Sequence, residues 1–233
     1  MSRIIVITGA SRGLGLAMVK HFLSLGDTVY GLSRSSSELT HAQYHHSEVD
    51  ISDANQIKQF FLELRRQVSH LDGLINNAGI ASMNAFATTP ADTIHNIFQV
   101  NVHGTSLCCQ KALSLLKKSP HPRIVNLTTV AVPLLLEGEA AYAASKSAVE
   151  TLTKIMAKEY GHFGITCNAI GPSPIATALI QNVPKEKIDK LIRRQAVKEM
   201  AEEADVLNAL DFFIQPESRM ISGQVLYLGG VSS

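Results

Sequence analysis

A tyrosine and a lysine four residues apart, in the stretch YAASK (142–146), form a pair whose side chains could do acid–base chemistry. Four residues are about one helical turn, so on a helix Tyr142 and Lys146 would project from the same face. A free tyrosine titrates near ~10, and a lysine close by would lower that pKa and make the phenol a usable acid near neutral pH. Many amphipathic helices carry the same spacing as a surface contact, so the pair alone leaves both interpretations open.

A glycine-rich turn, TGASRGLG (8–15), directly follows the first apolar run of the chain. Gly9 would permit a tight turn, while Gly13 and Gly15 would let the backbone approach a ligand closely. The turn opens a helix whose free N–H groups favour anions. A strand before and a helix after the turn indicate a site for a nucleotide pyrophosphate, although the glycine spacing differs from the common GxGxxG pattern.

These groups must be positioned by an alternation of strands and helices. Helical patterns separate most of the short apolar runs, which lie at 3–8, 28–33, 71–76, 123–128, 165–170 and 223–228, with a weaker run at 45–50. The alternation predicts βαβ units and a parallel sheet covered by helices on both faces. The stretch 171–200 breaks the rhythm, and we expect it to cross the carboxyl edge of the sheet, where ligands bind in open α/β folds.

Composition limits the alternatives. The chain has 233 residues, 45% of them hydrophobic, and no linker-like stretch, which predicts one domain over 1–233. A net charge of +1 argues against nucleic acid or an anionic membrane as partner. The three cysteines form no metal-ligand or disulfide spacing, and no signal peptide or membrane span is recognisable, so we expect a cytoplasmic protein. The stretch YHHS (44–47) is more typical of solvated residues than of a metal site, and no metal is expected.

Four motifs together, TGASRGLG, NNAG (76–79), VNVHGT (100–105) and YAASK, resemble those of the short-chain dehydrogenase/reductase family, from residue 3 to about 228. The resemblance implies one Rossmann-type doubly wound domain with a seven-stranded parallel sheet. Within the family, the chain is most similar to tetrameric 3-oxoacyl-[acyl-carrier-protein] reductases. The implied activity is reduction of a carbonyl to an alcohol by hydride transfer from a nicotinamide cofactor.

The resemblance also implies the cofactor contacts. NAD-preferring members usually carry an acid at the end of the second strand, where this chain reads LSR (32–34) and has no acid until Glu38. Arg34, with Arg12 of the glycine turn, could pair with a 2′-phosphate, which implies NADP(H), the alternative being a solvated loop arginine. Asp50 would reach the adenine. The other implied cofactor contacts are Gly9, Ser11, Gly13, Leu14, Gly15, Ile51, Asn77, Ala78, Gly79, Tyr142, Lys146, Pro172, Ile175 and Thr177.

Four residues match the family's catalytic positions. Tyr142 would be the acid, and Lys146 would tune its pKa and bind the cofactor. Thr129 stands where the family has a serine thirteen positions before the tyrosine; it keeps the hydroxyl but adds a methyl group and a stiffer first torsion. Thr128 is the alternative donor, although it would face the other way along a strand. Asn101 would help to position a water for proton relay.

The substrate is inferred from the expected lining of the cleft. The segment 132–140 lies between the proposed donor and acid, and the excursion would add Ile175, Ala178, Leu179 and Ile180. An apolar wall favours a 3-oxoacyl thioester or a similar apolar ketone. The alternatives are a sugar, polyol or other secondary-alcohol dehydrogenase, and a catalytically idle, nucleotide-sensing Rossmann protein.

Two kinds of protein partner follow from the resemblance. Acyl carrier protein is a candidate, but the positions that commonly carry basic residues in carrier-binding relatives are Pro120 and Phe163 here. A homotetramer or homodimer is expected, with the long helices at about 92–118 and 142–162 meeting across one two-fold axis and the C-terminal strand region across another. Two stretches depart from the family pattern. The family usually has Pro-Gly where this chain reads GPSP (171–174), near the expected nicotinamide contact, and the C-terminal YLGGVSS lacks the aspartate that is common before the double glycine.

Overall fold

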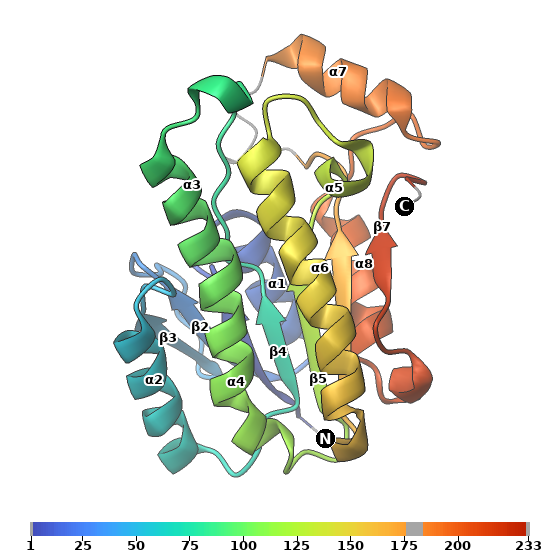
Figure 1. Cartoon of the computed structure of the whole chain (residues 1–233). Coiled ribbons are helices and arrows are strands. Elements are labelled where there is room, and N and C mark those ends of the chain that lie inside the picture. Colours follow the sequence, from blue (N-terminus) through green and yellow to red (C-terminus); the bar gives the residue numbers. More distant parts are fainter. Residues whose placement is uncertain (1, 176–183, 232–233) are drawn as a thin grey trace.

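A seven-stranded, all-parallel sheet forms the centre of the computed structural model, which describes residues 2–175 and 184–231 (Figure 1). The strand order is β3-β2-β1-β4-β5-β6-β7. The strands are β1 (Ile4–Thr8), β2 (Thr28–Ser33), β3 (Tyr44–Glu48), β4 (Gly73–Asn76), β5 (Arg123–Leu127), β6 (Thr166–Gly171) and β7 (Val225–Tyr227). The predicted doubly wound α/β fold is confirmed.

The inner strands are buried along their lengths because helices cover both faces of the sheet. Every residue of β4, β5 and β6 is buried. Their buried residues are mostly apolar, with the polar exceptions Asn76, Arg123, Asn126, Thr166 and Asn168. The edge strand β3 is exposed in part, and this explains its weaker sequence pattern.

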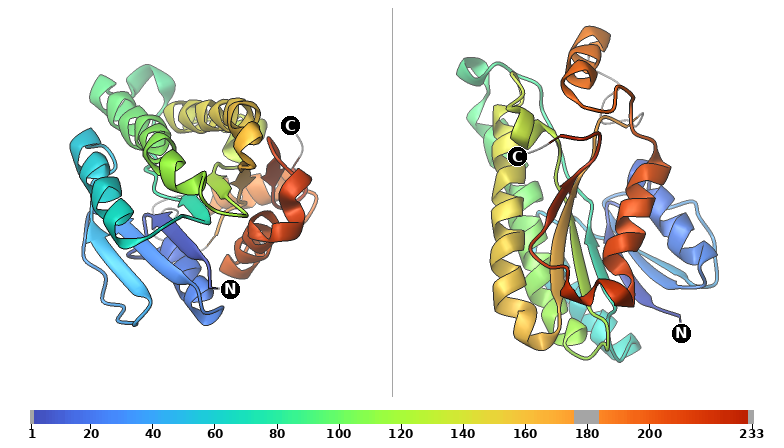
Figure 2. Two further views of the ribbon diagram at one scale, coloured as in Figure 1. Left: turned by 90° about the horizontal axis from the view of Figure 1, so that it is seen from below. Right: turned by 90° about the vertical axis from the view of Figure 1, so that its right-hand side faces the viewer.

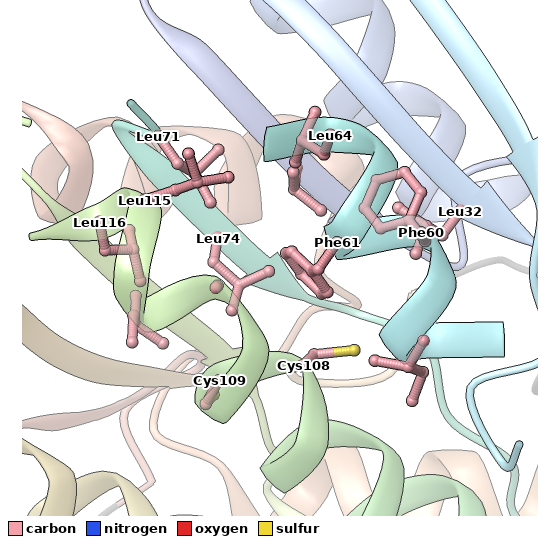
Figure 3. Close-up of a cluster of buried hydrophobic side chains, with 14 of the residues drawn as sticks. Leu32, Phe60, Phe61, Leu64, Leu71, Leu74, Cys108, Cys109, Leu115 and Leu116 are labelled. Atoms are coloured by element: carbon pink, nitrogen blue, oxygen red, sulfur yellow. The ribbon is translucent and has the colours of Figure 1, made fainter. Parts of the chain in front are cut away.

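Three long helices pack on one face of the sheet (Figure 2). They are α2 (Ala54–Gln67), α4 (Thr105–Leu116) and α6 (Ala140–Tyr160). Asp53 caps α2 by accepting hydrogen bonds from the N–H groups of Asn55 and Gln56. Figure 3 shows how Phe60 and Phe61 of α2 meet Leu74 of β4 and Cys108 of α4 in this core.

The opposite face is covered by α1 (Gly13–Ser24) and α8 (Glu203–Ile214), whose buried side chains form a second core. The three cysteines are buried free thiols, as expected from their spacing. None of the described helices has the length and apolar character needed to cross a bilayer.

The remaining helices surround the carboxyl ends of the strands or close turns. They are η1 (Phe86–Thr88), α3 (Ala91–Phe98), η2 (Gln99–Gly104), α5 (Ala131–Leu134), η3 (Gly161–Phe163), α7 (Lys185–Arg194) and η4 (Pro216–Met220). Figure 1 shows α7 beyond the end toward which the strands point, where the excursion was predicted. The chain moves from β1 outward to β3 and then returns to β4 on the other side of β1. This reversal opens a crevice at the carboxyl ends of β1 and β4.

Candidate functional site

A cleft of about 1740 Å³ lies at the carboxyl edge of the sheet. It is larger than the ~300–1,000 Å³ typical of a small-molecule pocket, so a dinucleotide and a substrate fit together. The predicted site residues that line it are Gly9, Ser11, Arg12, Gly13, Leu14, Gly15, Arg34, Asp50, Ile51, Asn77, Ala78, Gly79, Thr129, Tyr142, Lys146, Pro172 and Ile175. Asn101 is buried behind this lining. Thr177 lies outside the described residues, as do Ala178, Leu179 and Ile180.

The glycine turn is held against the end of β4. The Thr8 hydroxyl accepts hydrogen bonds from the N–H groups of Asn77 (3.1 Å) and Ala78 (3.0 Å). The Asn77 amide donates to the carbonyl groups of Thr8 (3.0 Å) and Gly9 (3.2 Å). Gly9 has a φ of +71°, and a Cβ there would lie 2.8 Å from the Asn77 Nδ2 atom. A Cβ on Gly15 would collide with the Gly9 carbonyl oxygen.

The first turn of α1 faces the same cleft. Arg12 precedes this helix and makes no side-chain cap hydrogen bond, so the first N–H groups remain available to an anion. Gly13 begins the helix with a φ of +52°, which favours glycine, and without a Cβ it does not obstruct close approach of a ligand. The cradle therefore fits the pyrophosphate predicted from the motif.

Arg12 and Arg34 are exposed and border one end of the cleft. Between them, the hydroxyl oxygens of Ser11 and Ser35 are 3.2 Å apart. Cations and hydroxyl groups are the donors that a phosphate prefers. Sequence reasoning named Ser11 but not Ser35, whose contribution depends on the fold of the loop after β2.

His46 supports this loop from behind, which the prediction of solvated residues at 44–47 did not foresee. Ser33 donates its hydroxyl hydrogen to the Ser35 carbonyl (2.9 Å) and also lies 2.7 Å from His46 Nε2. A hydroxyl has one hydrogen, so His46 Nε2 must carry the proton of the second bond. Asp50 orders the next loop by accepting from the N–H and the hydroxyl of Ser52 (2.9 and 2.7 Å).

Tyr142 and Thr129 both line the cleft, and their side chains interact. Burial raises the pKa of Tyr142 to about 12, while an interaction with the Thr129 hydroxyl opposes this shift and Glu139 adds to it. The sequence predicted a lowered pKa, because the spacing shows the nearby lysine but not the loss of solvent. The phenol is therefore protonated at neutral pH and available as a proton donor.

The two adjacent threonines have different hydrogen-bond partners. The Thr129 hydroxyl accepts from the Ala131 N–H (3.2 Å), which leaves its own hydrogen to donate. Thr128 donates its hydrogen to the buried Glu150 carboxylate (2.5 Å). This arrangement favours Thr129 over Thr128 as the donor to a substrate, in agreement with the predicted alternation. Glu150, 22 residues away in sequence, was not identified before the structure.

Lys146 lies within the protein with only 4% of its surface exposed. Its ammonium donates to the Leu127 carbonyl (2.7 Å), and burial lowers its pKa to about 8. Gly79 packs directly against it: a Cβ there would lie 3.2 Å from both Lys146 Nζ and Asn101 Oδ1. A glycine at position 79 is therefore what lets the NNAG turn pass beside the lysine.

Asn101 lies in the π-helical turn η2 between α3 and α4. Its side chain accepts from the Ile80 N–H and donates to the Ile80 carbonyl and the Ser145 hydroxyl, all at 2.9 Å. Ser145 in turn donates to the Tyr142 carbonyl (2.7 Å). Asn101 thus joins the turn after β4 to the helix that carries Tyr142 and Lys146. Its predicted role in positioning a water stays a prediction.

Comparison with known proteins agrees with this geometry. A short-chain dehydrogenase family model, described as enoyl-(acyl carrier protein) reductase, matches residues 9–232. This chain belongs to the short-chain dehydrogenase/reductase family. The family interconverts CH–OH and C=O groups, and its fold binds a nicotinamide cofactor, so this chain is an oxidoreductase.

Three similar proteins illustrate the range of this family. The 2-(R)-hydroxypropyl-CoM dehydrogenase of Xanthobacter autotrophicus is 32% identical, over 99% of this chain and 98% of that protein. The 3-oxoacyl-[acyl-carrier-protein] reductase of Staphylococcus aureus is 27% identical, over 99% and 98%. The solved structure of 4-hydroxyisoleucine dehydrogenase complexed with NADH superposes with a TM-score of 0.91 at 28% identity, over 99% of both chains.

Replacing Lys146 with methionine should reveal the energetic cost of this buried charge. Because its pKa is about 8 when folded and 10.5 when unfolded, the unfolded chain binds more protons between these values. The native protein should therefore gain about 2 kcal/mol of unfolding free energy from this group between pH 7 and pH 9.5. Lys146→Met should lack that gain, in urea unfolding without added cofactor.

Lys154→Met is the matched control, since Lys154 is exposed on the same helix. Its difference from the native protein should be constant over this pH range. Parallel stability curves for native protein and Lys146→Met would contradict the assignment of a buried, destabilised ammonium.

Proposed function

We propose that this short-chain dehydrogenase/reductase is an NADPH-dependent carbonyl reductase that acts on a 3-oxoacyl thioester or a similar apolar ketone. The observation that carries the proposal is the convergence of the Thr129 hydroxyl, the Tyr142 phenol and the Lys146 ammonium on one cleft with the glycine cradle. The idle, nucleotide-sensing alternative is disfavoured because all of these groups are present and positioned.

Each residue has a role that follows from its environment. When bound, NADPH supplies the hydride for the carbonyl carbon. Thr129 donates a hydrogen bond to the carbonyl oxygen and Tyr142 gives it a proton, for which its protonated state at neutral pH is suited. Lys146 is mostly charged at pH 7 and stabilises the phenolate that remains. Asn101 holds the turn at Ile80 that keeps these groups aligned.

Preference for NADPH is supported by Arg12 and Arg34 at the cleft end that also holds Ser11 and Ser35. Two guanidinium groups and two hydroxyls suit a 2′-phosphate, whereas a ribose 2′-hydroxyl is normally recognised by an acid. The NADH in the 4-hydroxyisoleucine dehydrogenase structure belongs to that protein, and cofactor choice can differ within the family.

An apolar substrate is supported by the segment between Thr129 and Tyr142. Among the described residues, the cleft lining here includes Val130, Pro133, Leu134, Leu135 and Leu136. Each buried methylene of a substrate would contribute about 0.8 kcal/mol against such a wall, while unpaired hydroxyls would be penalised. A sugar or polyol is therefore the less favoured alternative.

We also propose self-association as a homotetramer or homodimer in the cytoplasm. Apolar side chains are exposed on the outer helices and near the C-terminal strand, at Phe98, Ile155 and Leu226, where the family resemblance places subunit contacts. The three buried, unpaired thiols fit a reducing compartment.

A panel of substrates tests the activity. NADPH oxidation should be measured with 3-oxoacyl thioesters, simple ketones, sugars and polyols, with Tyr142→Phe as the blank. We expect turnover of thioesters or apolar ketones that this variant reduces by about a hundredfold or more, since general acid catalysis is worth ~10²–10⁴-fold. Sugars or polyols that react a hundredfold better than every thioester would support the alternative dehydrogenase instead.

Substitutions of Thr129 test the carbonyl donor. Thr129→Ser should keep activity, whereas Thr129→Val, nearly isosteric but without the hydroxyl, should lose kcat by roughly a hundredfold or more. Steady-state kinetics with a good substrate from the panel measures both. A valine variant with normal kcat would assign carbonyl polarisation to a different group.

Replacement of Arg34 tests cofactor choice. A charge-assisted bond to phosphate contributes roughly 1.5–3 kcal/mol, so Arg34→Ala should weaken NADPH binding about tenfold or more and leave NADH binding nearly unchanged. Fluorescence titration of both cofactors checks this. Arg66→Ala, at an exposed arginine of α2 outside the cleft lining, is the control. Equal losses for NADPH and NADH would reject the assignment.

A further inference from the structure

Helix α7 presents three cations to the substrate end of the cleft. Lys187, Lys190 and Arg194 line the cleft together with Ile188 and Leu191. Positions separated by three, four and seven residues share one face of a helix, so the three cations form one basic face that borders the cleft and stays exposed to solvent. The sequence predicted an apolar contribution from this excursion, and the described part of it contributes charge as well.

Contacts with the segment before Tyr142 hold the basic face in place. Arg194 Nη2 donates to the Leu134 carbonyl (2.6 Å). Lys187 Nζ lies 3.3 Å from the sulfur of Met83. It also faces Glu139, whose pKa is raised by burial and lowered in part by Lys187. The cations therefore lie beside the same segment that separates Thr129 from Tyr142.

The charges at this end of the cleft do not cancel. Its lining holds the three cations against two acidic residues, Glu137 and Glu139. Within the described part of the chain, no carboxylate oxygen lies within 4.0 Å of a nitrogen of Lys187, Lys190 or Arg194. Three cations without such a carboxylate partner, beside an apolar wall, suit a ligand that is apolar along its length and anionic at its end.

The positions first considered for carrier binding cannot provide this anion site within one copy of the chain. Pro120 and Phe163 precede β5 and β6, at the amino ends of the strands, whereas the cleft is at their carboxyl ends. Nearby, the Lys117 ammonium lies 3.8 Å from the centre of the Phe163 ring. Any anion site in this cleft therefore has to be built from other residues.

We propose that the basic face of α7 binds the phosphate of a phosphopantetheine-type thioester, the group that coenzyme A and acyl carrier protein share. This inference rests on the proposed reduction of 3-oxoacyl thioesters. The acyl chain and thioester lie along the apolar wall, and Lys187 and Lys190 contact the phosphate at the mouth of the cleft. Arg194 anchors the helix through Leu134.

A matched pair of substrates tests the phosphate contact. Acetoacetyl-CoA carries the phosphates, and S-acetoacetyl-N-acetylcysteamine has the same thioester without them. The native enzyme should favour the CoA form by tenfold or more in kcat/KM at low salt, and added salt should reduce that preference. Lys190→Gln should lower the ratio of the two kcat/KM values fivefold or more, mainly through KM for the CoA form.

Lys185→Gln is the matched control, because Lys185 is on α7 but outside the described cleft lining. It removes the same charge and should leave the ratio within twofold of native. Equal effects of the two substitutions, or equal losses on both thioesters, would overturn the proposal, as would a native enzyme without preference for the CoA form.

Acetoacetyl-acyl carrier protein distinguishes the two sources of the phosphate. A loss in Lys190→Gln for both the CoA and the carrier forms assigns the site to the shared phosphate. A loss for CoA alone would instead assign it to the nucleotide phosphates of CoA and overturn the shared-phosphate proposal. If the native enzyme reduces neither thioester and no apolar ketone of the panel, the proposed function fails; if it reduces such a ketone but neither thioester, the α7 inference fails and the carbonyl reductase activity stands. If it reduces the uncharged thioester without preferring CoA, only the α7 inference fails.

Discussion

The hydrogen bonds between Thr8 and Asn77 fix the geometry on which the cleft depends. They join the last residue of β1 to the turn that follows β4, and these two are neighbouring strands at the point where the strand order reverses. The two chain segments come so close that a side chain at Gly9 or Gly15 would collide with backbone or with Asn77. The glycine turn after β1, which forms the anion cradle, and the NNAG turn after β4, which lines the cleft, are therefore packed together as one unit.

Burial, without an ion pair, sets the acid–base properties of the proposed catalytic groups. Tyr142 and Lys146 are shifted in opposite directions, each mainly toward its neutral form by loss of solvent. A bound cofactor and substrate would deepen that exclusion of water, which strengthens every electrostatic contact in the cleft. The Leu127 carbonyl and the narrow space beside Gly79 hold Lys146 in this environment. The buried ammonium of Lys146 therefore lowers the stability of the fold at neutral pH, and the same charge is the one proposed to stabilise the Tyr142 phenolate.

Local patterns predicted the fold and most of the cleft lining, whereas features that depend on contacts distant in sequence were not predicted. Strand periodicity and the glycine turn are local properties, and the sheet follows from them. The direction of the Tyr142 pKa shift depends on burial, which the four-residue spacing does not show. His46 and Glu150 act through serine and threonine hydroxyls 13 and 22 residues away. The π-turn at Asn101 and the placement of the α7 cations beside the cleft likewise depend on tertiary packing.

The two ends of the cleft are built differently, and this limits what sequence can say about the substrate. The cofactor end consists of strand termini and the turns that immediately follow them, held by the hydrogen bonds of the sheet. The substrate end consists of the segment 130–139 and α7. Arg194 joins these two parts through the Leu134 carbonyl, and the Asn84 N–H joins the segment to the rest through the Gly138 carbonyl. Neither part belongs to the sheet, so relatives can differ there and act on different alcohols and ketones while they share a fold and a reaction. The substrate of this enzyme is therefore to be sought in the charges and apolar surface of that end.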